Sequence, residues 1–85
     1  MTMQKYNINI LVYQATQFVK SECNSITFIN YGTSVVTIQQ GIVLANGQSF
    51  TIEGNENELC IQQFLVTFDN SGTNNCTIVK KNYTN

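Results

Sequence analysis

Short runs in which apolar and polar residues alternate recur along the chain and constrain its fold more than any other feature. The runs with the clearest alternation are residues 6–12, 25–30, 34–39, 48–53 and 76–81. A period of two places successive side chains on opposite faces, as in a β-strand with one buried face. The run at 59–68, LCIQQFLVTF, is partly apolar on both faces, which is typical of a central strand. The sequence therefore predicts a chain built from strands.

Turn-forming residues separate these runs. Clusters that contain Gly, Asn, Asp or Ser occur at residues 30–34, 39–41, 45–47, 53–57 and 69–75. Gly and Asn accept positive φ, and Asx side chains bond nearby backbone groups, so each cluster predicts a change of direction. Strands at this spacing form sandwiches or barrels, and 85 residues suffice for one domain. We therefore expect residues 1–85 to form a single antiparallel β-sandwich, Ig-like or jelly-roll-like, with seven or eight short strands.

Residues 11–20 carry a second periodicity. At about 3.6 residues per turn, one face of a helix would contain Leu11, Val12, Ala15, Phe18 and Val19. No capping box or proline starts such a helix, and no glycine ends it. The β-branched and aromatic residues of the segment favour strands instead. We expect two strands that break near Gln14–Ala15, with a short helix as the alternative.

Charged residues are scarce. The chain has four lysines, no arginine and five acidic residues, and its net charge is −1. This balance gives no electrostatic footprint for nucleic acid and no polybasic patch for an anionic membrane. Asn, Thr, Gln and Ser make up 35 of the 85 residues, and such side chains hydrogen-bond without the large desolvation cost of a charge. The predicted surface suits contact with many protein neighbours.

No segment has the pattern of an export signal or a membrane span. The longest apolar runs, ILVY at 10–13 and IVLA at 42–45, fall far short of the length of about 18 residues that marks a membrane helix. The first ten residues lack a charged lead followed by an apolar stretch, so a secretory signal peptide is not expected. We expect a protein that is cytoplasmic at synthesis or is exported by another route.

The residue types that most often carry enzyme chemistry are missing. Histidine is absent, which removes the usual general base and the commonest metal ligand. Neither a Cys–His nor a Ser–His nucleophile can be built within one chain, and no SxxK motif offers a Ser–Lys pair. We expect no enzyme activity, no catalytic residue and no cofactor.

The three cysteines, Cys23, Cys60 and Cys76, show no CxxC spacing. Their odd number argues against a full disulfide framework, and free cysteines are commonly buried. We expect buried thiols. One disulfide between two of the three is the alternative.

Three of the five acidic residues, Glu53, Glu56 and Glu58, lie close together in the sequence. Their carboxylates could bind Ca²⁺ together with carbonyl groups of Asn55 and Asn57. The spacing is not that of an EF-hand loop, however. It also does not fix in place the roughly six to eight oxygen ligands that Ca²⁺ binds. The segment is more typical of a solvated hairpin tip, and we expect surface charge and no metal site there.

The strand edges and one aromatic residue point to contact with other proteins. Proline, which commonly blunts an edge strand, is absent and charges are few, so the edges are open to pairing with another chain. A chain of this length buries only a small core, and a partner subunit would add stability. Most aromatic residues lie in the alternating runs and are expected to pack in the core or on the sheets. Tyr31, which lies in a turn, is the best candidate for an exposed contact.

Residues 25–80 carry a recognisable order of turns and strands. It includes N-x-G-T at 30–33, an alternating strand, L-x-x-G-Q-S at 44–49, another strand, and G-N-x-x-E at 54–58. This order resembles small all-β virion structural and decoration proteins of tailed phages that infect Bacteroidota, of the crAss-like type. Ala45–Asn46 stands where such turns often have proline. The resemblance implies a non-enzymatic subunit present in many copies and bound to a capsid or tail, and it transfers no active site.

We therefore expect a virion structural protein, either a head decoration or a tail accessory subunit, made in the host cytoplasm. Its partners would be other virion proteins, namely capsid or tail subunits, within a homo-oligomer or a multi-copy assembly, with no nucleic acid and no membrane. The alternative is a module that binds a glycan or a receptor on the host surface.

Overall fold

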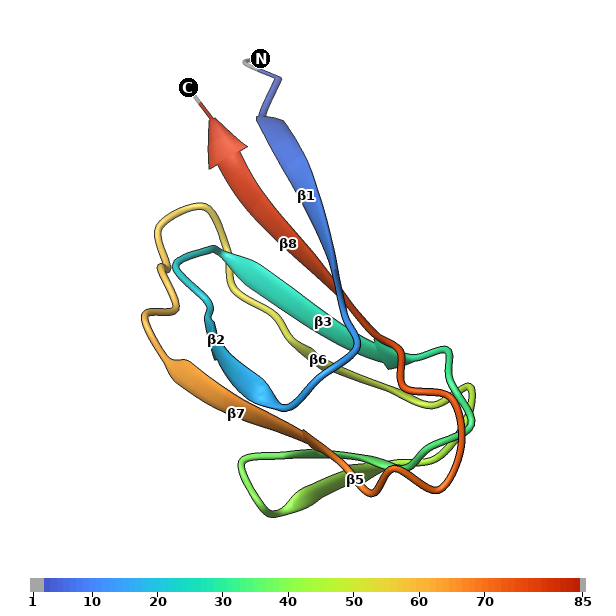
Figure 1. The fold of residues 1–85 in the computed structure, drawn as a ribbon. Coiled ribbons are helices and arrows are strands. Elements are labelled where there is room, and N and C mark those ends of the chain that lie inside the picture. The colour runs from blue at the N-terminus through green and yellow to red at the C-terminus, as the bar shows by residue number, and fades with distance from the viewer. Residues whose placement is uncertain (1–2, 85) are drawn as a thin grey trace.

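The part of the chain that the structure describes contains β-strands and no helix. The computed structural model describes residues 3–84, and within this range the chain has no helix long and apolar enough to cross a membrane. The strands are β1 (Lys5–Tyr13), β2 (Gln17–Lys20), β3 (Ser25–Asn30), β4 (Val36–Ile38), β5 (Ile42–Leu44), β6 (Ser49–Ile52), β7 (Gln63–Phe68) and β8 (Cys76–Thr84). Figure 1 labels all of these strands except β4. The predicted all-β class is confirmed, and so is the predicted number of strands.

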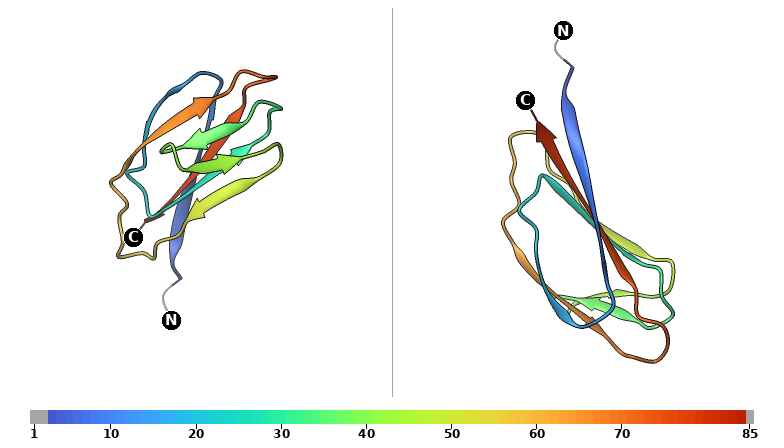
Figure 2. Two further views of the ribbon diagram at one scale, coloured as in Figure 1. Left: turned by 90° about the horizontal axis from the view of Figure 1, so that it is seen from below. Right: turned by 45° about the horizontal axis from the view of Figure 1, so that its top comes forward.

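The strands form two four-stranded antiparallel sheets, which face each other (Figure 2). Sheet A has the order β1-β8-β3-β6, and sheet B has the order β2-β7-β4-β5. The pairs β1–β8, β2–β7, β3–β6 and β4–β5 are those of one long hairpin rolled into two sheets. This is the jelly-roll arrangement. Of the two predicted kinds of sandwich, the strand order is therefore that of the jelly roll.

The core lies between the sheets and is filled by the apolar faces of the alternating runs. Ile26 and Phe28 of β3 and Val36 and Ile38 of β4 are fully buried, as their alternation predicts. The Phe28 ring meets the Phe64 ring of sheet B edge to face, with 5.2 Å between centroids. The buried apolar residues are Val19, Cys23, Ile26, Phe28, Val36, Ile38, Leu44, Phe64, Val66, Phe68, Cys76 and Ile78. None of them comes from β1 or β6, so both edge strands of sheet A are only partly attached to the core.

The segment with two periodicities forms two strands. β1 ends at Tyr13 and β2 begins at Gln17, which confirms the predicted break near Gln14–Ala15 and not the alternative helix. The reason is topological, because β1 belongs to sheet A and β2 to sheet B. The chain crosses from one sheet to the other at the break.

The last two strands differ in extent from the sequence pattern. β7 is central in sheet B, as predicted, but it begins only at Gln63. The preceding residues 59–62 are not part of a named strand and contain a single isolated bridge at Cys60. β8 continues to Thr84, beyond the alternation at 76–81, because it pairs with β1 over its whole length.

A buried asparagine connects the turns at one end of the sandwich. Asn30 has no exposed surface, and its amide donates to the carbonyl groups of Ser34 and Leu44 at 2.8 and 2.9 Å. Its Oδ1 accepts the Gly32 N–H at 2.9 Å. Buried polar groups need such partners. The predicted turn cluster at 30–34 therefore also fixes the position of β5 relative to β3.

β1 and β8 form a long two-stranded ribbon that projects beyond the rest of the sandwich (Figures 1 and 2). Each has nine residues, against three to six in the other strands. The molecule measures 50 × 19 × 16 Å. The ribbon carries the first part of β1 away from the core, and residues 5–10 are all exposed.

Candidate interaction surface on strand β1

One face of β1 is apolar and open to solvent. Tyr6, Ile8, Ile10 and Val12 alternate along the strand and are 53–61% exposed. The opposite face packs Leu11 against the core. Because successive side chains of a strand point to opposite faces, the four exposed residues lie on the outer surface of sheet A. We refer to these four residues as the β1 stripe.

The β1 stripe differs from the other exposed apolar residues. Those are spread over separate strands and loops, and they are Met3, Phe18, Tyr31, Val43, Leu59 and Ile61. Tyr31 is exposed, as the sequence predicts. Phe18 is 62% exposed because its neighbour Val19 takes the inward position. Scattered exposed apolar residues are normal, but four in a row on one strand indicate a contact surface.

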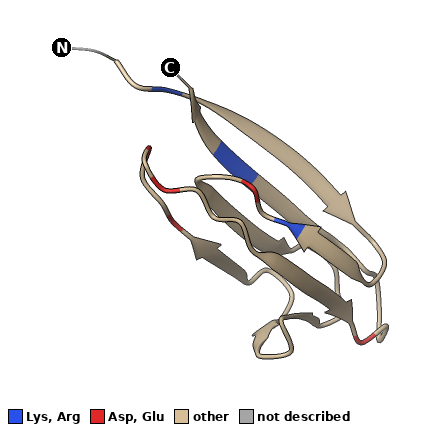
Figure 3. Ribbon diagram, turned by 90° about the vertical axis from the view of Figure 1, so that its left-hand side faces the viewer, with Lys and Arg blue, Asp and Glu red and all other residues tan. Residues whose placement is uncertain are grey.

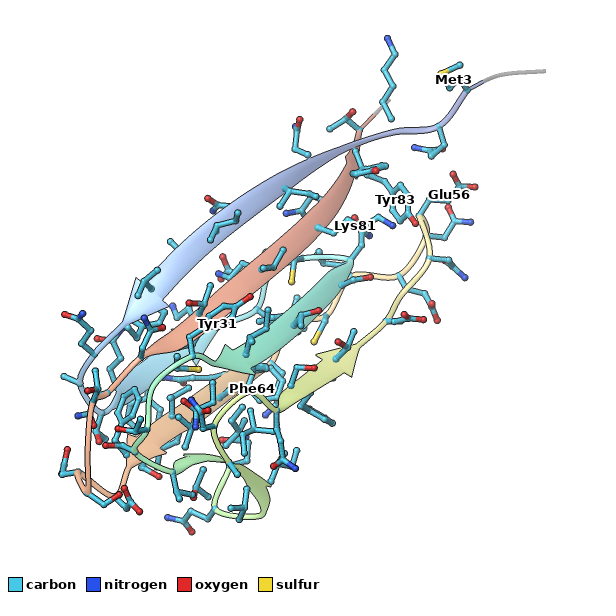
Figure 4. All side chains as sticks on the ribbon, turned by 90° about the vertical axis from the view of Figure 1, so that its right-hand side faces the viewer. Met3, Tyr31, Glu56, Phe64, Lys81 and Tyr83 are labelled. Carbon is cyan, nitrogen blue, oxygen red and sulfur yellow. The ribbon has the colours of Figure 1, made fainter. Side chains whose placement is uncertain are left out.

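β8 extends this surface with an aromatic patch at the end of the ribbon. Tyr83 and Lys81 lie opposite Tyr6 and Ile8. The two tyrosine rings meet edge to face at 6.3 Å, and the Lys81 ammonium lies 4.8 Å from the centre of each ring. Interaction with the Tyr83 hydroxyl raises the pKa of Lys81 above its ordinary value. Figure 4 shows Lys81 and Tyr83 close together near the end of β8.

β1 is an edge strand of sheet A, so within residues 3–84 one side of its backbone has no neighbouring strand. In an antiparallel sheet each residue directs its N–H and C=O to the same side, and successive residues alternate between sides. The Tyr31 N–H donates to the Asn75 carbonyl in register with the β3–β8 ladder, so odd-numbered residues of β8 bond to β3. Even-numbered residues of β8 therefore bond to β1. The Thr84 carbonyl, which accepts a bond from Gln4 Nε2, lies on that side.

The register between β1 and β8 then decides which groups of β1 are free. Odd-numbered residues of β1 pair with even-numbered residues of β8, as Asn9 does with Lys80, and they direct their backbone groups to β8. The four residues of the β1 stripe are even-numbered and direct their N–H and C=O away from the molecule. The same residues therefore offer apolar side chains and unpaired backbone groups, the two features that a further strand requires.

A shallow hollow adjoins the β1 stripe on the outer surface of sheet A. It encloses about 300 Å³ and touches β1 at Ile8. Four of its lining residues carry hydroxyl groups, and the Thr27 and Thr51 hydroxyls lie 3.0 Å apart. The remaining polar groups include Glu53 and Lys81. The hollow therefore offers hydrogen bonds to a small polar ligand and little apolar enclosure.

The three acidic residues of the loop after β6 lie in three different settings. All three glutamates are exposed, and Figure 3 shows how few other charged residues the molecule has. The Glu58 carboxylate accepts the Asn55 N–H at 2.9 Å, and the Asn24 side-chain amide donates to the Glu58 carbonyl at 2.6 Å. Glu53 instead lines the hollow, while Glu56 points into solvent beside the end of β8 (Figure 4). The loop is thus more ordered than a solvated tip needs to be, and residues 3–84 contain no group of three or more His, Cys, Asp or Glu side chains that could hold a metal ion.

The cysteines occupy different environments. Cys23 and Cys76 are buried, as expected, whereas Cys60 is half-buried, and all three are free thiols. Burial raises the pKa of Cys76 to about 11, and it also raises the pKa of Cys23. Cys76 therefore stays protonated and unreactive at neutral pH.

The sequence predicts the strand at residues 6–12 but not the direction of its apolar face. The missed signal is the pair Asn7 and Asn9 on the other face. Asn7 and Asn9 point to the same side of the strand as Leu11, and their polar side chains cannot cover an apolar core. The apolar residues of such a strand are left for solvent or for a partner.

Comparison with protein-family models, with curated proteins and with solved structures gave no match. The resemblance of residues 25–80 to phage virion proteins therefore stays a prediction. The features of the molecule that bear on its function are the β1 stripe, the open edge of β1 and the jelly-roll fold.

Proposed function

We propose that this protein is a non-enzymatic structural subunit that packs against other proteins in an assembly of many copies. The sequence resemblance suggests the virion of a tailed phage as the setting, with the protein as a head decoration or a tail accessory subunit. One observation carries the proposal: the residues of the β1 stripe combine exposed apolar side chains with backbone groups that point outward.

An open edge of this kind is a hazard for a protein that stays alone. Soluble proteins protect edge strands with proline, bulges or charged side chains. β1 contains no proline, and its only charge, Lys5, stands at its first position. A strand added beside β1 would bond the outward N–H and C=O groups, and its own side chains would cover part of the β1 stripe. A partner at β1 therefore removes the hazard and stabilises a small domain.

The fold and the surface chemistry support the same proposal. Eight-stranded jelly rolls occur in viral capsid proteins and in lectins, although a fold alone does not determine function. Neutral amide and hydroxyl side chains dominate the polar residues. Such groups form interfaces through hydrogen bonds rather than ion pairs, which suits a subunit with several neighbours.

A second candidate function is a module that binds a glycan or a receptor on the host surface. The hollow beside the β1 stripe favours it, because the hydroxyl groups of Thr27 and Thr51 would bond to a sugar and the Tyr83 ring would offer an apolar face. The hollow is shallow and the chain has no tryptophan. The structural role is therefore the better supported of the two.

Binding of the recombinant protein to its native particle tests the proposal. We expect the wild-type protein to co-sediment with the particle, and we expect Ile8→Asn to abolish this binding while the protein stays folded by circular dichroism. Val43→Asn is the matched control. Val43 is 61% exposed, close to the 55% of Ile8, but it lies on β5 at the far edge of sheet B.

The outcomes separate the two functions. Equal binding by the Ile8 and Val43 variants would refute a role for the β1 stripe. A wild-type monomer that ignores the particle but binds host glycans on an array, and loses this binding on Thr27→Val, would establish the second function. A mass-spectrometric inventory of the particle adds the copy number, which is high for a structural subunit and low for a receptor binder.

A further inference from the structure

Two of the three cysteines lie directly opposite each other. Cys23 and Cys60 form an isolated antiparallel bridge outside the named strands. The Cys23 N–H donates to the Cys60 carbonyl at 3.2 Å, and the Cys60 N–H donates to the Cys23 carbonyl at 2.8 Å. Residues that exchange both bonds have Cα atoms about 5.5 Å apart. That separation lies inside the range of about 4.4–6.8 Å found in disulfides.

The two side chains also point the same way. Directly paired residues of an antiparallel ladder project to one face. Cys23 belongs to the buried core, and Cys60 is half-buried and packs against that core. The two sulfur atoms therefore approach the core from adjacent positions, and the proximity of Cys60 adds to the effect of burial in raising the pKa of Cys23.

The surrounding hydrogen bonds hold the pair in place. Ser21, which has no exposed surface, places its hydroxyl 2.8 Å from the Cys60 carbonyl and 2.8 Å from the Gln62 nitrogen. The Ser21 N–H donates to the Gln62 carbonyl at 2.9 Å. The segment before β3 and the segment before β7 are thus held together by hydrogen bonds next to the cysteines.

Cys76 is excluded from this arrangement. It pairs with Asn30 at the far end of β3, whereas Cys23 precedes Ser25 at the near end. Six residues of extended strand separate the two ends, and each adds about 3.3 Å. No disulfide can span that distance.

We propose that Cys23 and Cys60 form a reversible disulfide when the protein meets an oxidising environment, and that Cys76 remains a thiol. The oxidant is a small-molecule disulfide such as oxidised glutathione. The Cys60 thiolate, the more accessible of the two, attacks one sulfur of the oxidant, and one glutathione thiolate leaves. The Cys23 thiolate then attacks Cys60 Sγ in the mixed disulfide, and the second glutathione thiolate leaves. Two protein thiols lose two electrons in all, and the two glutathione molecules take up these electrons and the two protons.

This disulfide has a defined structural effect. The segment 21–24 carries the chain from β2 in sheet B to β3 in sheet A, and the segment 53–62 carries it from β6 in sheet A to β7 in sheet B. The bond would join the two crossings and so fix the sheets to each other at one end. A subunit made in a reducing cytoplasm and released from the cell would become more stable on release.

The test uses the full chain, incubated with either oxidised glutathione or dithiothreitol, then denatured and alkylated. Three alkyl groups are expected after reduction and one after oxidation, with a loss of two hydrogen atoms in intact mass and a peptide that links Cys23 to Cys60. Cys76→Ser should carry two alkyl groups after reduction and none after oxidation. Cys60→Ser should carry two alkyl groups after either treatment. The melting temperature of the oxidised wild type should rise by about 10 °C or more, and that of Cys60→Ser should not change.

Three alkyl groups after oxidation, a linked peptide that contains Cys76, or disulfide-linked dimers as the main product would each overturn the proposal. Should Cys60→Ser fail to fold, Cys23→Ala supplies the same comparison, because either change removes one partner and leaves Cys76. This inference is independent of the proposed function, since the disulfide is read from mass and melting temperature alone.

Discussion

Proline at two adjacent positions of β1 should have opposite consequences. The Ile10 N–H points away from the molecule, so Ile10→Pro breaks no bond to β8, and proline is tolerated at such positions of edge strands. The Asn9 N–H points to Lys80 on β8, so Asn9→Pro removes a bond of the ladder and places the proline ring between two strands. The first change should spare the fold and the second should weaken it.

The size of the difference follows from the lost bond. A backbone hydrogen bond contributes about 0.5–1.5 kcal/mol, and an acceptor left without its partner raises the cost to about 1–3 kcal/mol. In a domain of this size about 1 kcal/mol lowers the melting temperature by about 4–8 °C. We expect Asn9→Pro to lower it by roughly 5–15 °C. Ile10→Pro should match Ile10→Ala, which removes the same side chain and keeps the N–H.

Binding to the native particle then separates the strand edge from the side chain. The proline ring removes one outward N–H and blocks the approach of another strand, so Ile10→Pro should bind at least tenfold more weakly than Ile10→Ala, or about 1.4 kcal/mol. Calorimetry measures stability and sedimentation measures binding. Equal binding by the two Ile10 variants would show that the edge does not pair with a partner. Equal destabilisation by the two prolines would show that the assigned direction of the backbone groups is wrong.

Three further changes probe the loops. Gly32→Ala should prevent folding or leave the protein insoluble, because a Cβ there would overlap the carbonyl oxygen of Thr73. Gly41→Ala should be tolerated, because the atom nearest to its added Cβ is 3.8 Å away. Soluble yield and circular dichroism compare the two variants. Hydrogen bonds from Ser71 hold the pKa of Asp69 below its ordinary value of 3.8, so their contribution to stability is complete above that pH and is lost as the pH falls through the lower pKa of the folded state. The difference in melting temperature between wild type and Asp69→Asn should therefore shrink below pH 3.8. A difference that grows in acid would contradict this. Glutamine at all three glutamates of the acidic loop should leave the melting temperature nearly unchanged with or without Ca²⁺, since glutamine still accepts the Asn55 N–H, and a Ca²⁺-dependent rise seen only in wild type would contradict it.

The sequence predicts strands well because alternation is a local property, and it predicts their partners poorly because pairing is not. The inward faces of β3 and β4 follow from residues within each strand, and both are buried as expected. The outward direction of the β1 stripe depends on β8, whose pairing joins Lys5 to Thr84 across almost the whole chain. No local pattern specifies that contact, so no local pattern shows where the core ends along β1.

At residues 59–68 the local pattern predicts a longer strand than the structure contains. Its apolar residues predict one long central strand, and its second half is that strand. The first half is not, and it exposes Leu59 and Ile61 while Cys60 alone makes a bridge. The chain must first cross from sheet A to sheet B here. The cysteine pair could not be chosen from spacing either, because only the crossing places Cys23 opposite Cys60.

The length of β1 is hard to account for within a single copy of the domain. Ordering the backbone costs about 1–2 kcal/mol per residue, and over residues 5–10 no buried side chain offsets it, because all six are exposed. The ladder to β8 returns only about 0.5–1.5 kcal/mol net for each hydrogen bond, so the projecting part of the ribbon is at best marginally stable by itself. A partner strand would add bonds to the outward N–H and C=O groups and would bury part of the β1 stripe at about 25 cal/mol per Å² of apolar surface. Internal packing gives a reason for β1 only from Leu11 onward, and contact with another protein gives a reason for the rest.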